Sequence, residues 1–226
     1  LAPLGALVAE VADPGWLQKG RETFKWFRQK GMSTYGLTEQ AFAACDAIKR
    51  AWRAAHPATV GLWGTLEQSF RDAIDNPGYV FPAGLASVVR PTFKSGKPMP
   101  WATIIMPSGR RLCYPAPKIE KDGQISYQGV DQYSRKWTTL RTYSGKLVEN
   151  LTQAVARDVI AHNLPAVQAA GYDVLLTVHD EDITEAPDTD AYSGAALAEI
   201  MARVPPWAAG LPLAAAGFDT YFYRKD

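Results

Sequence analysis

Apolar residues recur at helical spacing in the second half of the chain, over residues 142–158. An interval of four places side chains on one face of a helix, and the residues that keep this interval are Leu147, Leu151, Val155 and Val159. The polar residues between them fall on the other faces. The stretch therefore predicts a long amphipathic helix.

A buried strand is predicted after this helix. Residues 174–178 form an apolar run of residues that favour β-structure, and residues 183–187 can return as an antiparallel partner. The tight turn between the two strands would present three polar side chains together, which are His179, Asp180 and Glu181.

The first third of the chain shows helical patterns separated by turn residues. The sequence Asp-Pro-Gly-Trp at residues 13–16 is typical of a turn or a helix start, and residues 20–30 are basic and aromatic with helical spacing. Thr38 is a candidate N-cap for the next helix. Residues 58–73 carry an apolar stripe and predict a further helix.

The sequence Asp-Asn-Pro-Gly at residues 75–78 ends this helical part and predicts a domain boundary. Beyond it, short strand-like runs alternate with Gly and Pro, and residues 191–204 predict a closing helix. We therefore expect an α/β fold of the α+β type, with a helical domain at residues 1–75 and a domain with an antiparallel sheet at 76–226. The strand-like runs are residues 79–81, 86–89, 102–106 and 111–114.

Composition adds one asymmetry to this picture. The chain of 226 residues is 47% hydrophobic, has two cysteines and carries a net charge of +1. Residues 85–146 hold eleven Lys and Arg against three Asp and Glu, a net of +8, whereas residues 158–226 hold three against eleven, a net of −8. A duplex-binding surface beside an acidic cation site would give this division, and so would two ordinary solvated surfaces.

No run of about eighteen apolar residues predicts a membrane span, and no export signal is evident.

Two motifs in this order resemble the family A DNA polymerases, and among them the bacteriophage-type enzymes. The sequence Tyr-x-Gly-Lys-Leu-Val-Glu-Asn-x-x-Gln-Ala-x-Ala-Arg-Asp at residues 143–158 resembles the helix of the polymerase palm. The sequence Val-His-Asp-Glu at 178–181 resembles the third catalytic motif. The short acidic motif alone is weak, since most such turns are solvated loops. The resemblance extends over residues 13–226 and is densest from 105 to 225.

The resemblance implies nucleotidyl transfer to a primer 3′ end with two Mg²⁺ ions. On this interpretation Asp180 binds the metals, Glu181 assists nearby, and His179 positions the primer terminus. Mg²⁺ prefers carboxylate oxygens, and two carboxylates from different strands usually bridge such ions. The second bridging Asp belongs to the first motif, and we expect it to precede residue 1. Ala2 and Leu4 stand where that motif has Glu and Arg.

The nucleotide-binding helix of the family has Arg-x3-Lys-x7-Tyr-Gly. Arg21, Lys25 and Tyr35 imitate this pattern with two extra residues before the Tyr. Two residues add about 200° of helical rotation, which would take the Tyr away from the cations. The alternative is that residues 16–35 correspond to the helix before the nucleotide-binding helix, which would then be missing. We favour this alternative.

The resemblance also suggests DNA contacts. Gln153 and Asn150 correspond to residues that reach the minor groove of the primer–template, where amide groups meet acceptors of every correct base pair. Lys146, Arg141 and Arg157 are candidates for phosphate or helix-to-sheet contacts, and Arg157 could instead be structural. The basic turn that carries Arg110 and Arg111 could bind phosphates.

Three hypotheses follow from the sequence. The first is the C-terminal fingers and palm part of a polymerase that binds primer–template DNA and dNTP. An upstream region or a separate chain would supply the thumb, the first motif and the nucleotide-binding helix, and the setting would be the host cytoplasm. The second is a degenerate palm that binds nucleic acid without catalysis. The third, a metal-dependent phosphohydrolase or nuclease, leaves the helix motif unexplained.

Overall fold

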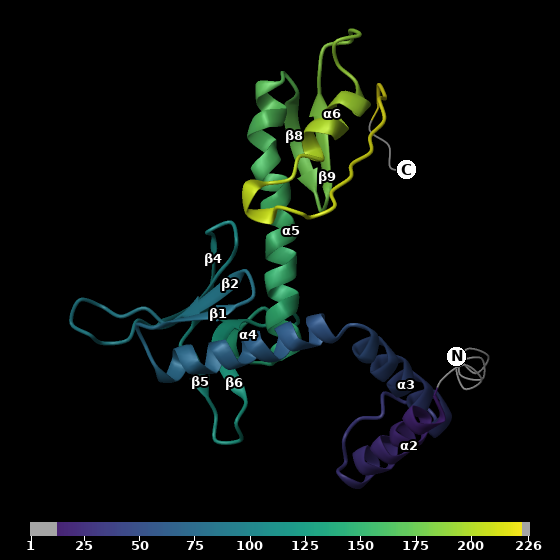
Figure 1. The fold of residues 1–226 in the computed structure, drawn as a ribbon, viewed down its shortest axis with the longest axis vertical. Coiled ribbons are helices and arrows are strands. Elements are labelled where there is room, and N and C mark those ends of the chain that lie inside the picture. The colour runs from purple at the N-terminus through teal and green to yellow at the C-terminus, as the bar shows by residue number, and fades with distance from the viewer. Residues whose placement is uncertain (1–12, 223–226) are drawn as a thin grey trace. The chain divides into compact units, whose positions relative to one another are not determined.

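The computed structural model describes residues 13–222 (Figure 1). The chain divides into two compact units between Leu62 and Trp63, within helix α4 (Pro57–Asp75). The sequence pattern changes from helices to strands later, where α4 ends at Asp75 and Gly78 adopts a φ of 93°. The division falls earlier because the second half of α4, including Leu66 and Phe70, packs in the core of the second unit.

The first unit contains two packed helices, α2 (Pro14–Gln29) and α3 (Glu39–Ala55). The side chain of Asp13 caps α2 by accepting from the amide of Gly15 at 2.7 Å, and Thr38 caps α3 as its sequence position predicts. The helices approach closely at Gly20, because a Cβ there would lie 2.8 Å from the Cα of Ala43. A side chain at position 20 would therefore push α2 and α3 apart.

The second unit begins with a four-stranded antiparallel sheet in the order β1-β2-β3-β4. Its strands match the four predicted runs to within a residue or two. They are β1 (Val80–Ala83), β2 (Ala86–Val89), β3 (Trp101–Ile105) and β4 (Arg111–Pro115). One face packs on α4 and forms the main core, in which Phe70, Val88 and Ile104 are fully buried.

A three-stranded antiparallel sheet follows, made of β5 (Lys118–Ile119), β6 (Ile125–Val130) and β7 (Trp137–Thr142). We did not predict these strands. Ile125 is fully buried in the same core, and Tyr127 packs against it. Side chains on the other face of β6 and β7 are mostly polar, which is why no apolar run marks them in the sequence.

Helix α5 (Ser144–Ala169) connects the parts of the second unit, and its prediction from the sequence is confirmed. Tyr143 offers no side-chain cap, and instead the Glu67 carboxylate on α4 accepts from the Ser144 amide at 2.8 Å. Leu147 and Leu151 pack in the main core. The far end of the helix carries Val167, which belongs to a second, smaller core.

The hairpin of β8 (Asp173–Val178) and β9 (Glu181–Glu185) lies along the C-terminal half of α5 (Figure 1). Helix α6 (Gly194–Met201), shorter than predicted, and the short helix η1 (Pro206–Ala208) complete the unit. Asn163 of α5 ties them together, because its amide donates to the carbonyls of Met201 and Arg203 at 2.9 Å each.

The expectation of a mixed fold with antiparallel sheets and packed helices is confirmed. Among the described residues, no helix is long and apolar enough to cross a bilayer. Ala2 and Leu4, on which the expectation for the first motif rests, lie outside the described residues.

Candidate active site at the Asp180 hairpin

The turn between β8 and β9 has the geometry that the sequence predicts. Val178 pairs with Glu181, so His179 and Asp180 form a two-residue connection between antiparallel strands. His179 has a φ of 54°, a left-handed conformation that non-glycine residues adopt uncommonly. The side chains of His179, Asp180 and Glu181 are all exposed. The turn thus presents two adjacent carboxylates and an imidazole to solvent.

The hairpin faces α5 through Asp182, a residue that the sequence analysis did not single out. Burial raises the pKa of Asp182, and the guanidinium of Arg157 on α5 lowers it in part. The Oδ1 atom of Asp182 is buried without a hydrogen-bond partner. Gln153 lies one turn before Arg157 on the same helix face and is exposed. The structure therefore places the hairpin beside the helix face that carries Gln153.

Arg110, a predicted phosphate contact, binds within the protein. Its Nε lies 2.5 Å from Oδ1 of Asp158, and its Nη2 donates to the carbonyl of Ala154 at 3.0 Å. The hydroxyl of Ser108 donates to the other carboxylate oxygen of Asp158, which is 7% exposed. This cluster joins the turn between β3 and β4 to α5.

Asn150, a predicted minor-groove contact, also has a protein partner. Its Nδ2 donates to the hydroxyl of Tyr114 on β4 at 3.2 Å. Burial raises the pKa of Tyr114 to about 12, an effect that the hydrogen bond from Asn150 opposes. The amide of Asn150 thus helps to fix α5 on the sheet.

Two further residues predicted to contact phosphates, Lys146 and Arg141, form ion pairs within the described residues, and Arg111 does not. Lys146 lies 3.0 Å from Glu149, whose hydrogen bond raises the pKa of the Lys146 ammonium. Arg141 donates to Asp122 at 2.9 Å, beside a pocket of about 330 Å³. Arg111 is exposed and makes no side-chain hydrogen bond or ion pair within the described residues.

The three residues of the predicted nucleotide site do not share one helix face. Arg21 and Lys25 are exposed on α2, which ends at Gln29. Tyr35 lies beyond that end, is 77% exposed and has a φ of 56°. Among the described residues, then, α2 carries the cations without the Tyr.

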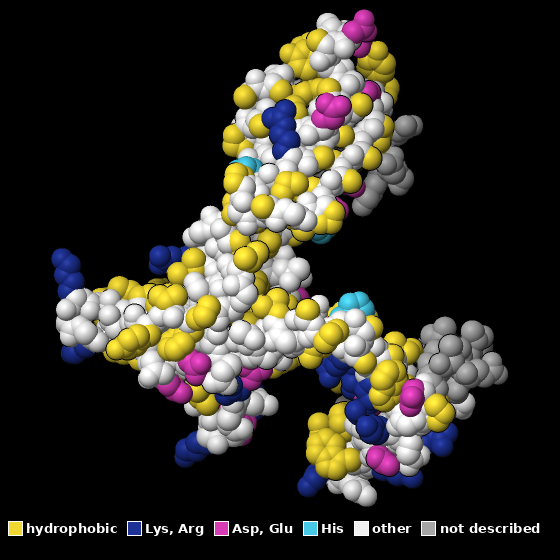
Figure 2. Space-filling model, viewed as in Figure 1, with side chains coloured by type: hydrophobic (Ala, Val, Ile, Leu, Met, Phe, Trp, Pro, Cys, Tyr) yellow, Lys and Arg dark blue, Asp and Glu magenta, His cyan; other side chains and the backbone are white. Residues whose placement is uncertain are grey.

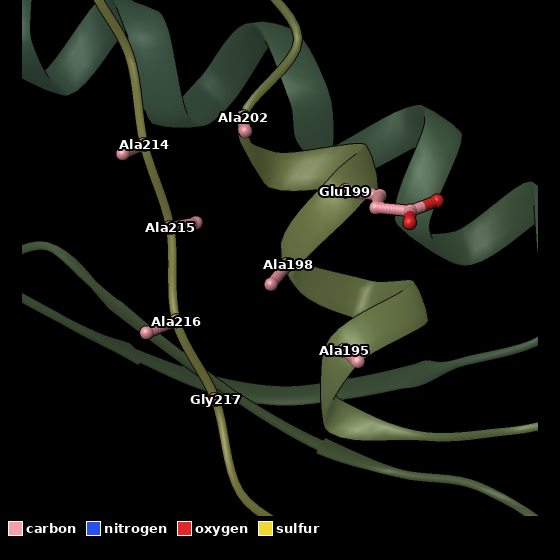
Figure 3. A pocket seen from close by; sticks show the side chains of 8 residues that line it. All are labelled: Ala195, Ala198, Glu199, Ala202, Ala214, Ala215, Ala216 and Gly217. Carbon is pink, nitrogen blue, oxygen red and sulfur yellow. The ribbon is translucent and has the colours of Figure 1, made fainter.

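A pocket of about 400 Å³ lies between α6 and the following segment (Figure 3). Alanine side chains and the backbone of Gly217 line most of it, and Glu199 is its one charged residue. It contains none of the predicted site residues. The pocket offers an apolar surface and little chemistry.

Comparison with known proteins places this geometry in context. The chain is 36% identical over 207 residues to a DNA polymerase of Bacillus phage SP02. The chain is thus similar to part of a bacteriophage DNA polymerase. The match covers 88% of this chain but 30% of that polymerase, so the chain spans about a third of the relative's length. No family model and no solved structure matches the chain.

This similarity confirms the predicted resemblance to part of a bacteriophage DNA polymerase. The face drawn in Figure 2 shows Lys and Arg side chains at the projecting ends of the strand-rich part and several acidic side chains around α6. This agrees with the division of charge in the sequence. In the part of the chain that the structure describes, no group of three or more His, Cys, Asp and Glu side chains is arranged to hold a metal.

Proposed function

We propose that this chain is the C-terminal fingers and palm part of a phage-type family A DNA-directed DNA polymerase. The observation that carries the proposal is the 36% identity, over 88% of the chain, to the DNA polymerase of Bacillus phage SP02. The two carboxylates at the turn between β8 and β9, beside the helix with Gln153, support it. The chain would work within a larger polymerase, in the cytoplasm of a phage host.

In this proposal the Asp180 hairpin supplies part of the catalytic site. Asp180 and Glu181 offer the carboxylate oxygens that Mg²⁺ prefers, on a turn open to solvent. Their chemistry fits the ion, but two adjacent carboxylates make half of a two-metal site. The second bridging Asp would come from the first motif. When bound, Mg²⁺ lowers the pKa of the attacking 3′ hydroxyl and neutralises phosphate charge. His179 would hold the primer terminus against the carboxylates.

The exposed strands support the idea that further polymerase sequence packs here. The prediction that strand β8 is buried is wrong for the described residues, because Leu175 and Leu176 in its middle are 54% and 53% exposed. The sheet of β8 and β9 has two strands, so each strand leaves one edge unpaired among the described residues. Two-stranded sheets are marginally stable alone, and open apolar strands invite a partner. We infer that an upstream region, or a separate chain with the thumb and first motif, covers β8.

The protein-side contacts sort the proposed DNA-binding residues into two groups. Gln153 and Arg111 are exposed without a partner among the described residues, so we assign them to the minor groove and to a phosphate. The others bind within the protein and would position α5 and the sheet beneath the duplex. This second group comprises Asn150, Lys146, Arg141 and Arg110.

On the alternative that we favour, the dNTP would bind mainly to a nucleotide-binding helix that lies outside the described residues. Arg21 and Lys25 remain candidates for triphosphate contacts, but Tyr35 lies off their helix. Without the first-motif Asp and a complete triphosphate clamp, the 226 residues should not extend a primer alone. Each 1.36 kcal/mol of lost transition-state stabilisation costs about tenfold in rate.

Two measurements on the purified chain test the proposal. Anisotropy of a labelled primer–template should give an affinity whose logarithm falls with log salt, by about 0.9 per phosphate neutralised. Absent or salt-independent binding contradicts a duplex-binding palm. In a primer-extension assay with Mg²⁺, the chain should be inactive, and addition of the upstream polymerase region should restore synthesis. Incorporation by the isolated chain would instead place a working nucleotide site within the first 36 residues.

A further inference from the structure

The hairpin of β6 and β7 has one face in the core and one in solvent. The strands pair from Ile125 opposite Thr142 to Val130 opposite Trp137. Ile125 and Thr142 are buried, so this end of the hairpin is anchored. The other end projects from the N-terminal end of α5, away from the β8–β9 hairpin (Figure 1). Its connection, residues 131–136, lies outside both strands.

Aromatic side chains are concentrated at this projecting end and take no part in the core. Tyr133 is 96% exposed, Trp137 is 63% exposed, and Val130 opposite Trp137 is 53% exposed. Tyr and Trp bury large areas when they pack and dominate the energetics of many interfaces. Within the described residues, neither ring stacks on another aromatic ring or makes a side-chain hydrogen bond. Their exposure therefore indicates a surface that meets another molecule.

Two cationic residues lie between Tyr133 and Trp137 in the sequence, and neither is paired with an acidic side chain within the described residues. Arg135 and Lys136 are exposed, and their side chains make no hydrogen bond or ion pair within the described residues. The carboxylate of the nearby Asp131 stabilises the turn, because its Oδ1 accepts hydrogen bonds from the amides of Ser134 at 2.7 Å and Tyr133 at 3.2 Å. These backbone bonds lower the pKa of Asp131.

The backbone of this connection is held in one conformation by further hydrogen bonds. The amide of Asp131 donates to the carbonyl of Lys136 at 2.9 Å, and the amide of Arg135 donates to the carbonyl of Asp131 at 2.9 Å. Arg135 itself has a φ of 56°. The turn therefore presents its side chains from a fixed support, which lowers the entropy that a ligand would have to remove.

We propose that this surface, formed by Tyr133, Arg135, Lys136 and Trp137, binds single-stranded nucleic acid. Exposed rings stack on unpaired bases in a sequence-tolerant way, and adjacent cations neutralise the backbone phosphates. A duplex offers the same phosphates but keeps its bases stacked inside, so the rings would have no face to meet. Charge complementarity thus favours nucleic acid, and the exposed rings favour a single strand over a duplex.

The inference rests on the proposed function only for the biological identity of the strand, which is the template overhang of a primer–template. Binding itself requires neither catalysis nor metal. Helix α5 separates this surface from the Asp180 hairpin. Ser144 at the start of α5 and Arg157, which faces Asp182 of that hairpin, are thirteen residues or about 20 Å apart along the helix axis. The surface would therefore hold template nucleotides remote from the primer terminus.

Anisotropy of a labelled mixed-sequence DNA oligonucleotide, without nucleotide or Mg²⁺, tests the proposal on the full chain. The variant Tyr133→Ala/Trp137→Ala should lose at least about fivefold in affinity for the single strand and less than twofold for a blunt duplex. Tyr133→Phe keeps a ring and should bind as the parent does. Tyr79→Ala removes an aromatic side chain that is 70% exposed elsewhere, and should also leave binding unchanged.

The cations are tested separately through the dependence on salt. Arg135→Gln/Lys136→Gln should lower the slope of log affinity against log salt by about 1.4 for the single strand, since each neutralised phosphate contributes about 0.7. Unchanged single-strand affinity in both double variants, or an equal loss in Tyr79→Ala, overturns the proposal and leaves a protein partner as the occupant. These outcomes do not depend on primer extension, so an inactive chain can still pass the test.

Discussion

Removal of the Arg110 guanidinium should destabilise the second unit and leave the salt dependence of duplex binding unchanged. The guanidinium bonds to the Asp158 carboxylate at 2.5 Å and to the carbonyl of Ala154 at 3.0 Å. In Arg110→Ala the carboxylate, which is 7% exposed, keeps the Ser108 hydroxyl as its remaining side-chain partner. A buried carboxylate that loses a cationic partner raises the free energy of the folded state.

The magnitude follows from the exposure of the two groups. Breaking a fully buried ion pair from one side costs about 3–5 kcal/mol. The side chain of Arg110 is 50% exposed, so water screens the pair and the value must be reduced. We expect about 2 kcal/mol, or about a 30-fold lower ratio of folded to unfolded protein. A double-mutant cycle of Arg110→Ala and Asp158→Ala should give a coupling energy of about 1 kcal/mol or more.

Urea unfolding followed by circular dichroism measures the stabilities, and anisotropy across salt measures the duplex contacts. Arg111→Ala is the matched control, since Arg111 is the next residue and makes no ion pair within the described residues. It should change stability by less than about 0.5 kcal/mol and lower the salt slope by about 0.9. The reasoning is refuted if Arg110 and Asp158 show no coupling, or if Arg110→Ala lowers the slope as Arg111→Ala does.

Three further predictions concern the supports of the site. Burial raises the pKa of Glu67, but hydrogen bonds from Arg71 and Ser144 outweigh it and hold this pKa below its usual value of 4.5. The wild-type protein should therefore be about 1 kcal/mol more stable than Glu67→Gln at neutral pH. Urea titrations should show this difference disappear as the pH falls from 4.5 through the pKa of Glu67 in the folded state. Because the pKa of Tyr114 rises from 10.0 to about 12 on folding, the protein should lose roughly 2–3 kcal/mol between pH 10 and 12 relative to Tyr114→Phe, measured by the same unfolding assay. Leu175→Gln should leave the stability of the isolated chain within about 0.5 kcal/mol but reduce primer extension after the upstream region is added; equal extension would mean that nothing covers β8.

The elements that sequence reasoning located are those with a local pattern. The apolar run and acidic turn predicted the hairpin around Asp180, and the interval of four predicted α5. Thr38 predicted the start of α3 because an N-cap acts within one helical turn. In each case the signal and the structure involve neighbouring residues.

The parts that were missed depend on residues distant in the chain. Strands β6 and β7 contain no continuous apolar run, because polar residues such as Gln128 and Thr139 on their outer face separate the apolar ones. Arg110 and Asp158 are 48 positions apart, and neither residue type identifies its partner. From the sequence, an arginine in an exposed turn is interpreted as a phosphate contact. The structure shows that Arg110 instead pairs with the buried Asp158.

The same limit applies to the helix start at Ser144, where the cap comes from Glu67 on another helix. It applies also to Asp182, whose burial depends on the packing of the hairpin against α5. Sequence patterns could place the candidate catalytic residues on their elements. They could not show which polar side chains are already bound within the protein.

The central claim is that the Asp180 hairpin carries a catalytic carboxylate of a DNA polymerase. Its most direct test is primer extension with Mg²⁺ by the longer polymerase that contains this chain, with Asp180→Ala compared against the parent and against Asp182→Asn. The account predicts that Asp180→Ala lowers the extension rate at least about a thousandfold, equivalent to roughly 4 kcal/mol, while primer–template affinity changes less than threefold. Extension by Asp180→Ala at a rate near that of the parent would contradict it.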